Sequence, residues 1–206
     1  MFRAAPEAAI AVSAPRVILA STSPYRRALL ERLRIPFEVQ APGVDETALP
    51  DEAPGSLALR LAEAKARAVG ACAPASLVIG SDQVAELDGQ CLGKPGGHVE
   101  AVAQLKAMRG RDVVFHTALA LLNTASGRIQ LASVPTTVRF RAYGDEEIER
   151  YLALEQPYDC AGSAKIEGLG IALVERVTND DPSALIGLPL IRLATMLAGE
   201  GISIIR

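Results

Sequence analysis

The fold is decided by the stretch Val17-Ile18-Leu19-Ala20-Ser21-Thr22-Ser23-Pro24-Tyr25-Arg26-Arg27. Its first four residues are apolar and give way to polar ones, a pattern typical of a short buried strand. Ser23 and Pro24 then supply a helix N-cap and a first-turn proline, which predicts a helix from about residue 24 to residue 33. A buried strand that runs directly into a helix is the unit from which α/β proteins are built.

The rest of the chain repeats this alternation. Further helices are predicted where apolar residues recur at helical spacing, at 56–69, 100–108, 145–154 and 190–198. Strands are predicted at 37–39, 77–80, 84–87, 90–92, 113–122, 129–141 and 170–177, with Asp88-Gly89 as the turn of a tight hairpin. Together these patterns predict an α/β protein with a mixed, elongated sheet flanked by helices.

Length and composition set the domain organisation. The 206 residues are half apolar and 22% charged, enough to bury the core of one globular domain. We expect residues 1–14, an Ala-rich segment interrupted by Pro6 and Glu7, to be a flexible leader before a single domain at 15–206. The net charge of −3 lacks the basic surplus that binding to a nucleic acid polymer requires.

Two further features concern the protein's surroundings. The sequence has no run of about twenty apolar residues that could cross a bilayer. Cys72, Cys91 and Cys160 are odd in number and far apart, which fits neither a disulfide framework nor a zinc site, so we expect buried free thiols. We therefore predict a soluble, cytoplasmic protein with no membrane partner.

The first candidate site is the helix start itself, where hydroxyls and free backbone N–H groups meet two guanidinium groups. Arg26 and Arg27 lie in the first turn, where the partial positive charge of the helix disfavours cations unless an anion binds there. A phosphate group bound with Ser21 and Ser23 would resolve this conflict. The alternative is that both arginines reach away to solvent or to acidic neighbours.

A second set of charged residues lies further along the chain. Asp82 follows the predicted strand 77–80, at the carboxyl end where α/β sheets usually place ligands, and it could hold a divalent metal or take a proton from water. Glu46, in a Pro-rich loop, could join it. The alternatives are a strand-end turn residue for Asp82, a solvated charge for Glu46, and simple surface roles for Lys65 and Lys94.

Five stretches of the sequence follow one another in a recognisable order. They are Leu19 to Arg27, Val44-Asp45-Glu46, Ala62-Glu63-Ala64-Lys65-Ala66, Gly80-Ser81-Asp82-Gln83 with Gly93-Lys94-Pro95, and Ala161-Gly162-Ser163 with Gly187-Leu188-Pro189-Leu190. As an ordered set that covers nearly the whole chain after residue 14, they resemble the Maf family of nucleotide pyrophosphatases. One such fragment alone would carry little weight.

The resemblance implies a fold and an activity. The fold is an α/β architecture like that of the inosine triphosphatases, in which a single catalytic domain, residues 15–206 here, has two lobes with a cleft between them. The activity is cleavage of a nucleoside triphosphate to monophosphate and pyrophosphate, with Mg²⁺, or else Mn²⁺, as cofactor. A possible homodimer rests on family analogy alone.

The resemblance also assigns roles to residues. Those at the family's phosphate-binding positions are Ser21, Arg26, Arg27, Lys65 and Lys94. Asp82 matches the acidic residue assigned as the base, while Glu46 and Asp82 as metal ligands remain an expectation from the residues alone. Cationic donors and a metal would neutralise the charge that develops as the bond to pyrophosphate breaks, while Asp82 orients or deprotonates the attacking water.

Three positions bear on the identity of the base. Tyr25, Gln83 and Glu167 resemble the residues of the 7-methyl-GTP pyrophosphatases, except that Tyr25 stands where that subgroup carries tryptophan. An aromatic face attracts the positively charged 7-methylguanine, and a carboxylate accepts its N1–H and N2–H donors. The resemblance therefore implies 7-methyl-GTP, or a related modified guanine nucleotide, as substrate. In the alternative, Tyr25 only covers the helix start and Glu167 is a loop charge.

Two other functions stay open at this point. One is the dTTP/UTP pyrophosphatase branch of the same family, which differs at the three positions that bear on the base. The other is a nucleotide-binding regulator of septum formation that does no chemistry. The presence of Asp82, Lys65 and Lys94 argues against a loss of catalysis.

Overall fold

The computed structural model describes residues 15–205, so the predicted leader at 1–14 lies outside the described residues. Its strands form one seven-stranded sheet. They are β1 (Arg16–Ala20), β2 (Glu38–Gln40), β3 (Ser76–Leu87), β4 (Gln90–Leu92), β5 (Asp112–Asn123), β6 (Ile129–Phe140) and β7 (Val174–Thr178). The spatial order is β2-β1-β3-β5-β6-β7, with β4 paired to β3 outside this path.

The sheet is mixed, as the sequence predicts. Strand β1 runs parallel to both β2 and β3, while β5, β6 and β7 add to β3 in antiparallel fashion. The short hairpin of β3 and β4 turns at Asp88 and Gly89, which both have positive φ angles of 51° and 80°. A two-residue turn with both φ angles positive matches the twist of the flanking strands, which explains the Asp-Gly pair.

The helices fall close to their predicted positions. They are α1 (Pro24–Glu31), α2 (Pro54–Gly70), α3 (His98–Met108), α4 (Asp145–Glu155) and α5 (Leu190–Gly199), with 3-10 turns η1 (Ala161–Ser163), η2 (Leu169–Leu173) and η3 (Ala184–Ile186). The N-cap of α1 is Ser23, whose hydroxyl accepts a hydrogen bond from the Arg26 backbone N–H at 3.3 Å. The predicted strand 170–177 is partly wrong, because its first residues belong to η2.

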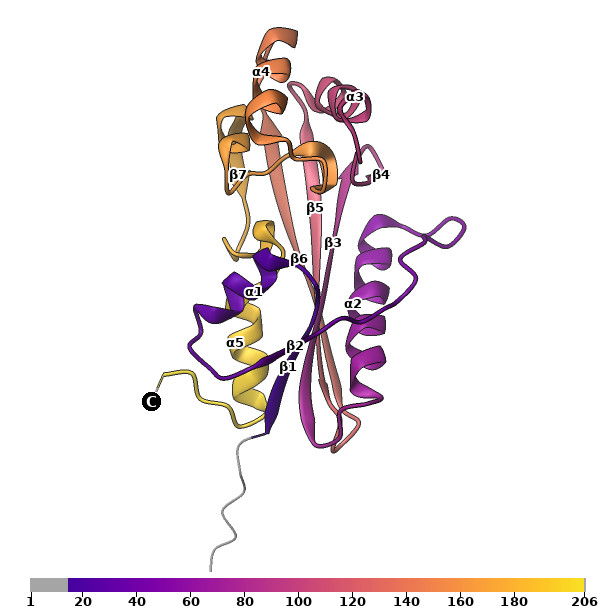
Figure 1. The fold of residues 1–206 in the computed structure, drawn as a ribbon, viewed down its shortest axis with the longest axis vertical. Coiled ribbons are helices and arrows are strands. Elements are labelled where there is room, and N and C mark those ends of the chain that lie inside the picture. Colours follow the sequence, from indigo (N-terminus) through magenta and orange to yellow (C-terminus); the bar gives the residue numbers. More distant parts are fainter. Residues whose placement is uncertain (1–14, 206) are drawn as a thin grey trace, which may run out of the picture.

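Helices cover both faces of the sheet at its lower end (Figure 1). Successive side chains of a strand point to opposite faces, and Ile18 and Val78 accordingly pack against α2. Leu19 and Ile79, one residue further along each strand, pack against α1 and α5 on the other face. The two buried clusters are why β1 and the first half of β3 are apolar on both sides.

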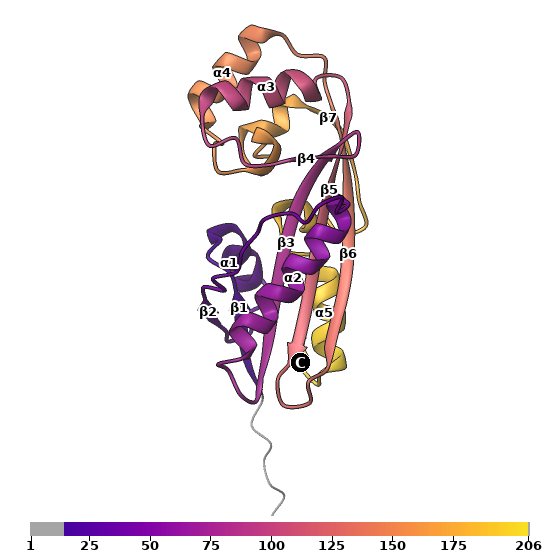
Figure 2. The same ribbon diagram turned by 90° about the vertical axis from the view of Figure 1, so that its right-hand side faces the viewer.

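Helices α3 and α4 lie at the other end of the long strands β3, β5 and β6 (Figure 2), where they cover a third core. Ala85 of β3 and Phe115 of β5 pack there against α3 and α4 through Leu105 and Ile148. Ala85 has the same parity along β3 as Ile79, so α3 and α4 lie on the sheet face that also carries α1 and α5. The helices therefore form two helical groups on one set of strands, one of α1, α2 and α5 and the other of α3, α4 and the 3-10 turns η1 and η2. The boundaries of a single catalytic domain at 15–206 stay a prediction.

The expectation that a strand ends at Gly80 and delivers Asp82 at its carboxyl end is wrong. Strand β3 continues to Leu87 and pairs with β5 without a break from Leu77 to Glu86. Gly80 serves close packing instead, because a Cβ atom there would lie 2.1 Å from the Ala62 carbonyl oxygen of α2. Asp82 is therefore a mid-strand residue and not the strand-end turn residue of the alternative interpretation.

The cysteines also differ from expectation. All three are free, but Cys72 and Cys91 are exposed and Cys160 is half-buried. Cys72 follows the end of α2, and Cys91 lies on the short edge strand β4, two places that leave side chains open to water. Among the described helices, none is long and apolar enough to cross a membrane.

Candidate active site

The candidate site opens at a gap in the sheet. Strand β1 pairs with β3 from Ser76 to Gly80, and β4 pairs with it from Ala85 to Leu87. Between them, residues 81–84 of β3 have no partner strand on this edge among the residues that the structure describes. A cavity of about 530 Å³ lies against this open edge, with walls from both helical groups.

Nine of the ten candidate residues from the sequence line this one cavity. They are Ser21, Tyr25, Arg26, Glu46, Lys65, Asp82, Gln83, Lys94 and Glu167. These positions span nearly 150 residues of sequence and come from α1, α2, β3 and four loops. The fold therefore brings the scattered candidates together, although their individual roles stay predictions.

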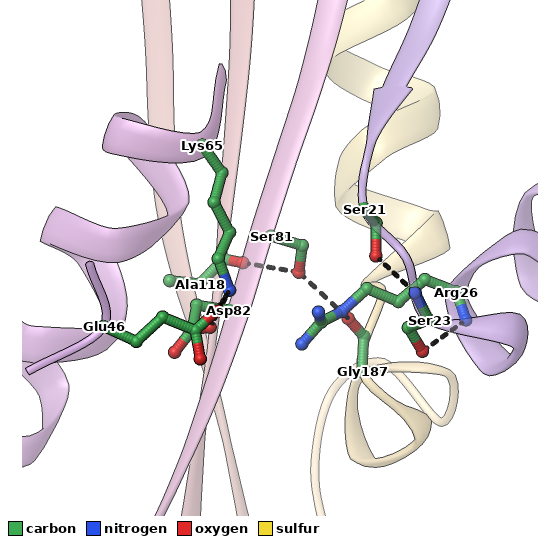
Figure 3. Close-up of polar contacts among 9 residues, drawn as sticks. All are labelled: Ser21, Ser23, Arg26, Glu46, Lys65, Ser81, Asp82, Ala118 and Gly187. Atoms are coloured by element: carbon green, nitrogen blue, oxygen red, sulfur yellow. Dashed lines mark hydrogen bonds and ion pairs between the residues drawn. The ribbon is translucent and has the colours of Figure 1, made fainter. Parts of the chain in front are cut away.

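Two carboxylates and one ammonium group meet on one wall of the cavity (Figure 3). The Lys65 Nζ atom of α2 lies 2.6 Å from Asp82 Oδ1 and 2.5 Å from Glu46 Oε1. The side chains of Lys65 and Asp82 are 6% and 10% exposed, whereas that of Glu46 is 52% exposed. Lys65 thus shares one buried positive charge between two carboxylates, and Glu46 closes the cluster from the solvent side.

The two carboxylates differ in their proton affinity. Burial raises the pKa of Asp82 above its ordinary value, although Lys65 and Arg26 act to lower it. For Glu46, burial also acts to raise the pKa, but the hydrogen bond from Lys65 and the nearby cations outweigh it, and the pKa falls. Asp82 is therefore the carboxylate better suited to accept a proton.

The helix start of α1 forms the opposite wall (Figure 3). The Arg26 Nε donates a hydrogen bond of 2.9 Å to the carbonyl oxygen of Gly187, which also lies 2.9 Å from the Ser81 hydroxyl. Among the described residues, no carboxylate lies within 4.0 Å of the Arg26 side chain, and burial lowers its pKa against the effect of Asp82 and Glu46. A half-buried guanidinium group held in place without a carboxylate partner is suited to bind an anion.

Arg27 lies differently from its neighbour. Its side chain is exposed on the outer surface of α1, and its Nε atom pairs with Glu31 Oε1 at 3.1 Å. It does not line the cavity. The geometry matches the alternative in which this arginine reaches an acidic neighbour, and its assignment to phosphate binding stays a prediction.

Lys94 lies on the loop after β4. Its side chain is exposed and lines the cavity, where its charge helps to lower the pKa of Glu46. The loop is held from the far helical group, because Gln104 Nε2 and the Gly162 N–H both donate to the Gly93 carbonyl oxygen, at 3.0 and 3.3 Å. We call the part of the cavity lined by Arg26, Lys65, Asp82 and their charged neighbours Glu46 and Lys94 the charged end.

The other part of the cavity, the aromatic end, is lined by Tyr25 and Glu167. Burial raises the pKa of Glu167, as do Glu155 and Asp159, while a backbone hydrogen bond and Lys165 act to lower it. Lys165 also lies near the half-buried Tyr25 ring, with its Nζ atom 5.9 Å from the ring centroid. This end combines an aromatic face with a carboxylate, both supplied by segments outside the sheet.

Gln83 of β3 also lines the cavity. Its Nε2 atom is 2.9 Å from Thr117 Oγ1 and 3.1 and 3.0 Å from the carbonyl oxygens of Ala184 and Leu185. These contacts fix η3 against the sheet. The Oε1 atom of the same amide has no hydrogen-bond partner among the described residues.

Sequence reasoning missed three residues that shape the site. Ser81 and Thr117 hold η3 and its following turn through Gly187 and Ala184, and the Gly187 carbonyl positions Arg26. Gly187 has a φ angle of +118°, which explains why the sequence has glycine in this turn. Ser81 and Gly187 lie in the stretches that resemble the family, but that resemblance assigns them no role, and Thr117 lies outside those stretches.

The two carboxylates of the site are the candidate ligands for a metal ion. Glu46 and Asp82 present two carboxylates to a shared cation, the Lys65 ammonium group. Within residues 15–205, no group of three or more His, Cys, Asp or Glu side chains could hold a metal ion. Two carboxylates fit Mg²⁺, which proteins bind through one or two carboxylates while water and substrate phosphates complete the shell.

A comparison with protein families identifies the chain. The family model described as Maf-like protein matches residues 16–200. The chain belongs to the Maf family. The resemblance predicted from the five ordered stretches is thereby confirmed, and the cavity lies within the matched region.

Close relatives of this Maf protein carry a more specific name. A 7-methyl-GTP pyrophosphatase of Albidiferax ferrireducens is 60% identical over 190 residues, which cover 92% of this chain and 96% of the relative. Proteins of the same name from Burkholderia pseudomallei and Thiobacillus denitrificans are 60% and 58% identical, over 93% and 94% of this chain and 90% and 96% of the relatives.

One solved structure is similar to the Maf chain at a lower level. The Staphylococcus aureus Ham1 protein matches with a TM-score of 0.44 and 16% sequence identity, over 63% of this chain and 74% of that one.

Proposed function

We propose that this protein hydrolyses 7-methyl-GTP to 7-methyl-GMP and pyrophosphate, with Mg²⁺, or else Mn²⁺, as cofactor. The observation that carries the proposal is the charged end, where Asp82 and Lys65 face Arg26 across one cavity. The relatives named as 7-methyl-GTP pyrophosphatases, about 60% identical over nearly the whole chain, support the choice of substrate.

The charged end suits the triphosphate. Arg26 and Lys94 offer cationic donors that no carboxylate among the described residues pairs with, and Ser21 adds a hydroxyl at the helix start. Lys65 contributes the same charge from a buried position. In this proposal these groups hold the triphosphate and stabilise the charge that moves onto pyrophosphate as the bond breaks.

Asp82 is the proposed base. Its raised pKa favours proton uptake, and Lys65 holds the carboxylate in a fixed orientation. From this position Asp82 orients a water molecule toward the α-phosphorus and accepts its proton. Product release then yields a monophosphate and pyrophosphate without a covalent intermediate.

Glu46 and Asp82 would hold the metal, which when bound supplies positive charge to the phosphate oxygens. The aromatic end would take the base, with the Tyr25 ring facing the charged purine and Glu167 accepting its N–H donors. Gln83, whose Oε1 atom faces no partner in the described chain, is the third proposed specificity residue. Arg27 is assigned to phosphate by family resemblance alone.

The remaining predictions belong to the same proposal. We place the activity in the cytoplasm, which the free thiols support because disulfides are rare in reducing compartments. A single catalytic domain at 15–206 is consistent with one cavity that both helical groups line. A homodimer remains a prediction from the family.

The experiment is a substrate panel. The protein and Mg²⁺ are incubated with 7-methyl-GTP, GTP, dTTP and UTP, and pyrophosphate and orthophosphate are measured separately. We expect pyrophosphate release with the highest kcat/KM for 7-methyl-GTP. Orthophosphate as the product would overturn the proposed bond cleavage.

Two other outcomes would each favour an alternative. If dTTP or UTP gives the highest kcat/KM, the protein is a pyrophosphatase of the other branch. If triphosphates bind but no pyrophosphate forms with either Mg²⁺ or Mn²⁺, a non-catalytic regulator of septum formation gains support.

A further inference from the structure

Lys165 lies near both residues of the aromatic end. Its Nζ atom lies 5.9 Å from the centroid of the Tyr25 ring, within the range at which an ammonium group is attracted to an aromatic face. It lies two residues before Glu167 in the same loop. Tyr25 belongs to α1 in one helical group and Lys165 to the loop after η1 in the other, so this contact spans the cavity.

The Lys165 side chain is fixed by Glu155, at the end of α4. Its Nζ atom lies 2.7 Å from Glu155 Oε1, and the two side chains are 27% and 15% exposed. The other carboxylate oxygen of Glu155 accepts a hydrogen bond of 2.8 Å from the Leu169 backbone N–H. Glu155 therefore binds the 165–169 loop at both of its ends, with Glu167 at the middle.

The backbone of this loop is folded tightly around the same pair. The Lys165 N–H donates to the Tyr151 hydroxyl, and the Lys165 carbonyl oxygen accepts from the N–H groups of Gly168 and Gly170, all at 3.0 Å. A Cβ atom at Gly168 would lie 2.8 Å from a Glu155 carboxylate oxygen, and one at Gly170 would lie 2.6 Å from the Lys165 carbonyl oxygen. Glycine at position 170 is therefore needed for the loop to close on Lys165, and a side chain at position 168 would displace the Glu155 carboxylate.

We propose that Glu155 and Lys165 are positioning residues for base recognition, which set the place of Glu167 relative to the Tyr25 ring. Lys165 is held by Glu155 on one side and contacts Tyr25 on the other, so it fixes the spacing across the aromatic end. Its charge also favours the ionised form of Glu167, which is the form that accepts two N–H donors of a guanine. The inference rests on the proposed function.

The test separates positioning from general stability by comparing two substrates. 7-Methyl-GTP and 7-methyl-ITP carry the same charge on the base, but 7-methyl-ITP lacks the N2 amino group that Glu167 would bind. In Lys165→Met we expect KM for 7-methyl-GTP to rise about 10-fold with kcat changed less than about 2-fold. Discrimination, which is the kcat/KM for 7-methyl-GTP divided by that for 7-methyl-ITP, should fall about 5-fold. The reason is that one charge-assisted hydrogen bond is lost or weakened.

Three further variants make the result specific. Lys165→Arg keeps the charge and should restore most of the discrimination. Glu155→Gln keeps an acceptor for the Leu169 N–H but loses the ion pair, and should reproduce part of the defect. Lys106 pairs with Asp145 on the surface and does not line the cavity. Lys106→Met should therefore change neither KM nor the discrimination between the two substrates.

The double variant Lys165→Met/Glu155→Gln removes both charges, so neither is left unpaired. If a single variant does not fold, the same kinetic comparison is made with the double variant. The inference is overturned if folded variants keep the wild-type discrimination, or if both substrates lose the same factor in kcat. Failure of the proposed function looks different, because wild-type protein would then release no pyrophosphate from 7-methyl-GTP.

Discussion

Lys65 and Asp82 of the charged end and Glu167 of the aromatic end are held by different kinds of structure. Lys65 and Asp82 come from the middle of α2 and β3, whose close contact is possible because residue 80 is glycine. Glu167 comes from a loop folded around one ion pair, Glu155 with Lys165. The proposed base and its lysine partner thus rest on regular elements with buried cores on each face, whereas the proposed acceptor for the guanine N–H donors rests on a loop.

This contrast indicates where substitutions should be tolerated. Side chains on helices and strands are held by the packing of the whole sheet, whereas a loop depends on a few local contacts. We therefore expect substitutions at the charged end to act on turnover or on folding, and those at the aromatic end to act on the choice of base. At the charged end and in the packing around it, the expected effects range from a large loss of turnover to a small change in stability with pH.

The largest effect is expected for Asp82→Asn. The variant keeps the shape of the side chain but cannot act as a base, so kcat should fall about 10²- to 10⁴-fold. The melting temperature should stay close to that of the wild type, because Lys65 retains Glu46 as a partner. Full turnover in this variant would remove Asp82 from the chemistry, and Asp145→Asn on the surface of α4 is the matched control.

The second prediction contrasts neighbouring arginines. Arg26→Ala removes the guanidinium group that lines the cavity and should weaken triphosphate binding about 10- to 100-fold, as for the loss of hydrogen bonds to a charged group. Arg27→Ala removes only an exposed pair with Glu31 and should change binding less than about 2-fold. Isothermal titration with 7-methyl-GTP measures both. Equal losses would support the family assignment of Arg27 to phosphate.

The third prediction concerns the packing under the charged end. In Gly80→Ala the new Cβ atom would lie 2.1 Å from the Ala62 carbonyl oxygen, so α2 and β3 must separate. We expect a loss of about 1 to 3 kcal/mol in the free energy of unfolding, measured with denaturant. Gly93→Ala is the control, because nothing lies within 4 Å of its Cβ position. A loss of equal size in both would mean that α2 packing is not the cause.

The smallest effect is expected for the loop that carries Glu46. Glu52 binds Arg60 there, and the hydrogen bonds from Arg60 lower the pKa of Glu52 to about 2. A carboxyl group with a lowered pKa stabilises the folded state above its ordinary pKa and loses that effect as the pH falls toward 2. The Tm difference between wild type and Glu52→Gln should therefore shrink between about pH 6 and about pH 3. A constant difference would contradict the prediction.

The sequence predicted the charged end better than the aromatic end, for a physical reason. Periodicity and capping residues mark regular elements, so the helix after Ser23 and the helix that carries Lys65 were found within a few residues of their bounds. The position of Asp82 relative to the end of its strand was wrong, because Gly80 was interpreted as a boundary. Nothing in a single sequence reveals that Gly80 allows a helix to approach.

The aromatic end could not be derived in this way. Tyr25 and Glu167 were paired only by resemblance to a family, and Lys165 was not singled out at all. Its contacts depend on how the loop after η1 folds back toward α4, which is decided by tertiary hydrogen bonds such as that from the Lys165 N–H to Tyr151. Interactions of this kind leave no periodic pattern for sequence analysis to detect.

The uninterrupted register of β3 has a consequence for engineering. Asp82 pairs with Ala118 and Gln83 with Thr117, and the two adjacent side chains point to opposite faces of the strand. Substitution of Gln83 can therefore change the contacts with η3 while the Asp82 carboxylate stays beside Lys65. Insertion of a single residue before Asp82 would reverse both at once, turning the acid toward η3 and the amide toward α2. In directed evolution of this protein, position 83 can therefore be substituted, but residues should not be inserted into or deleted from β3.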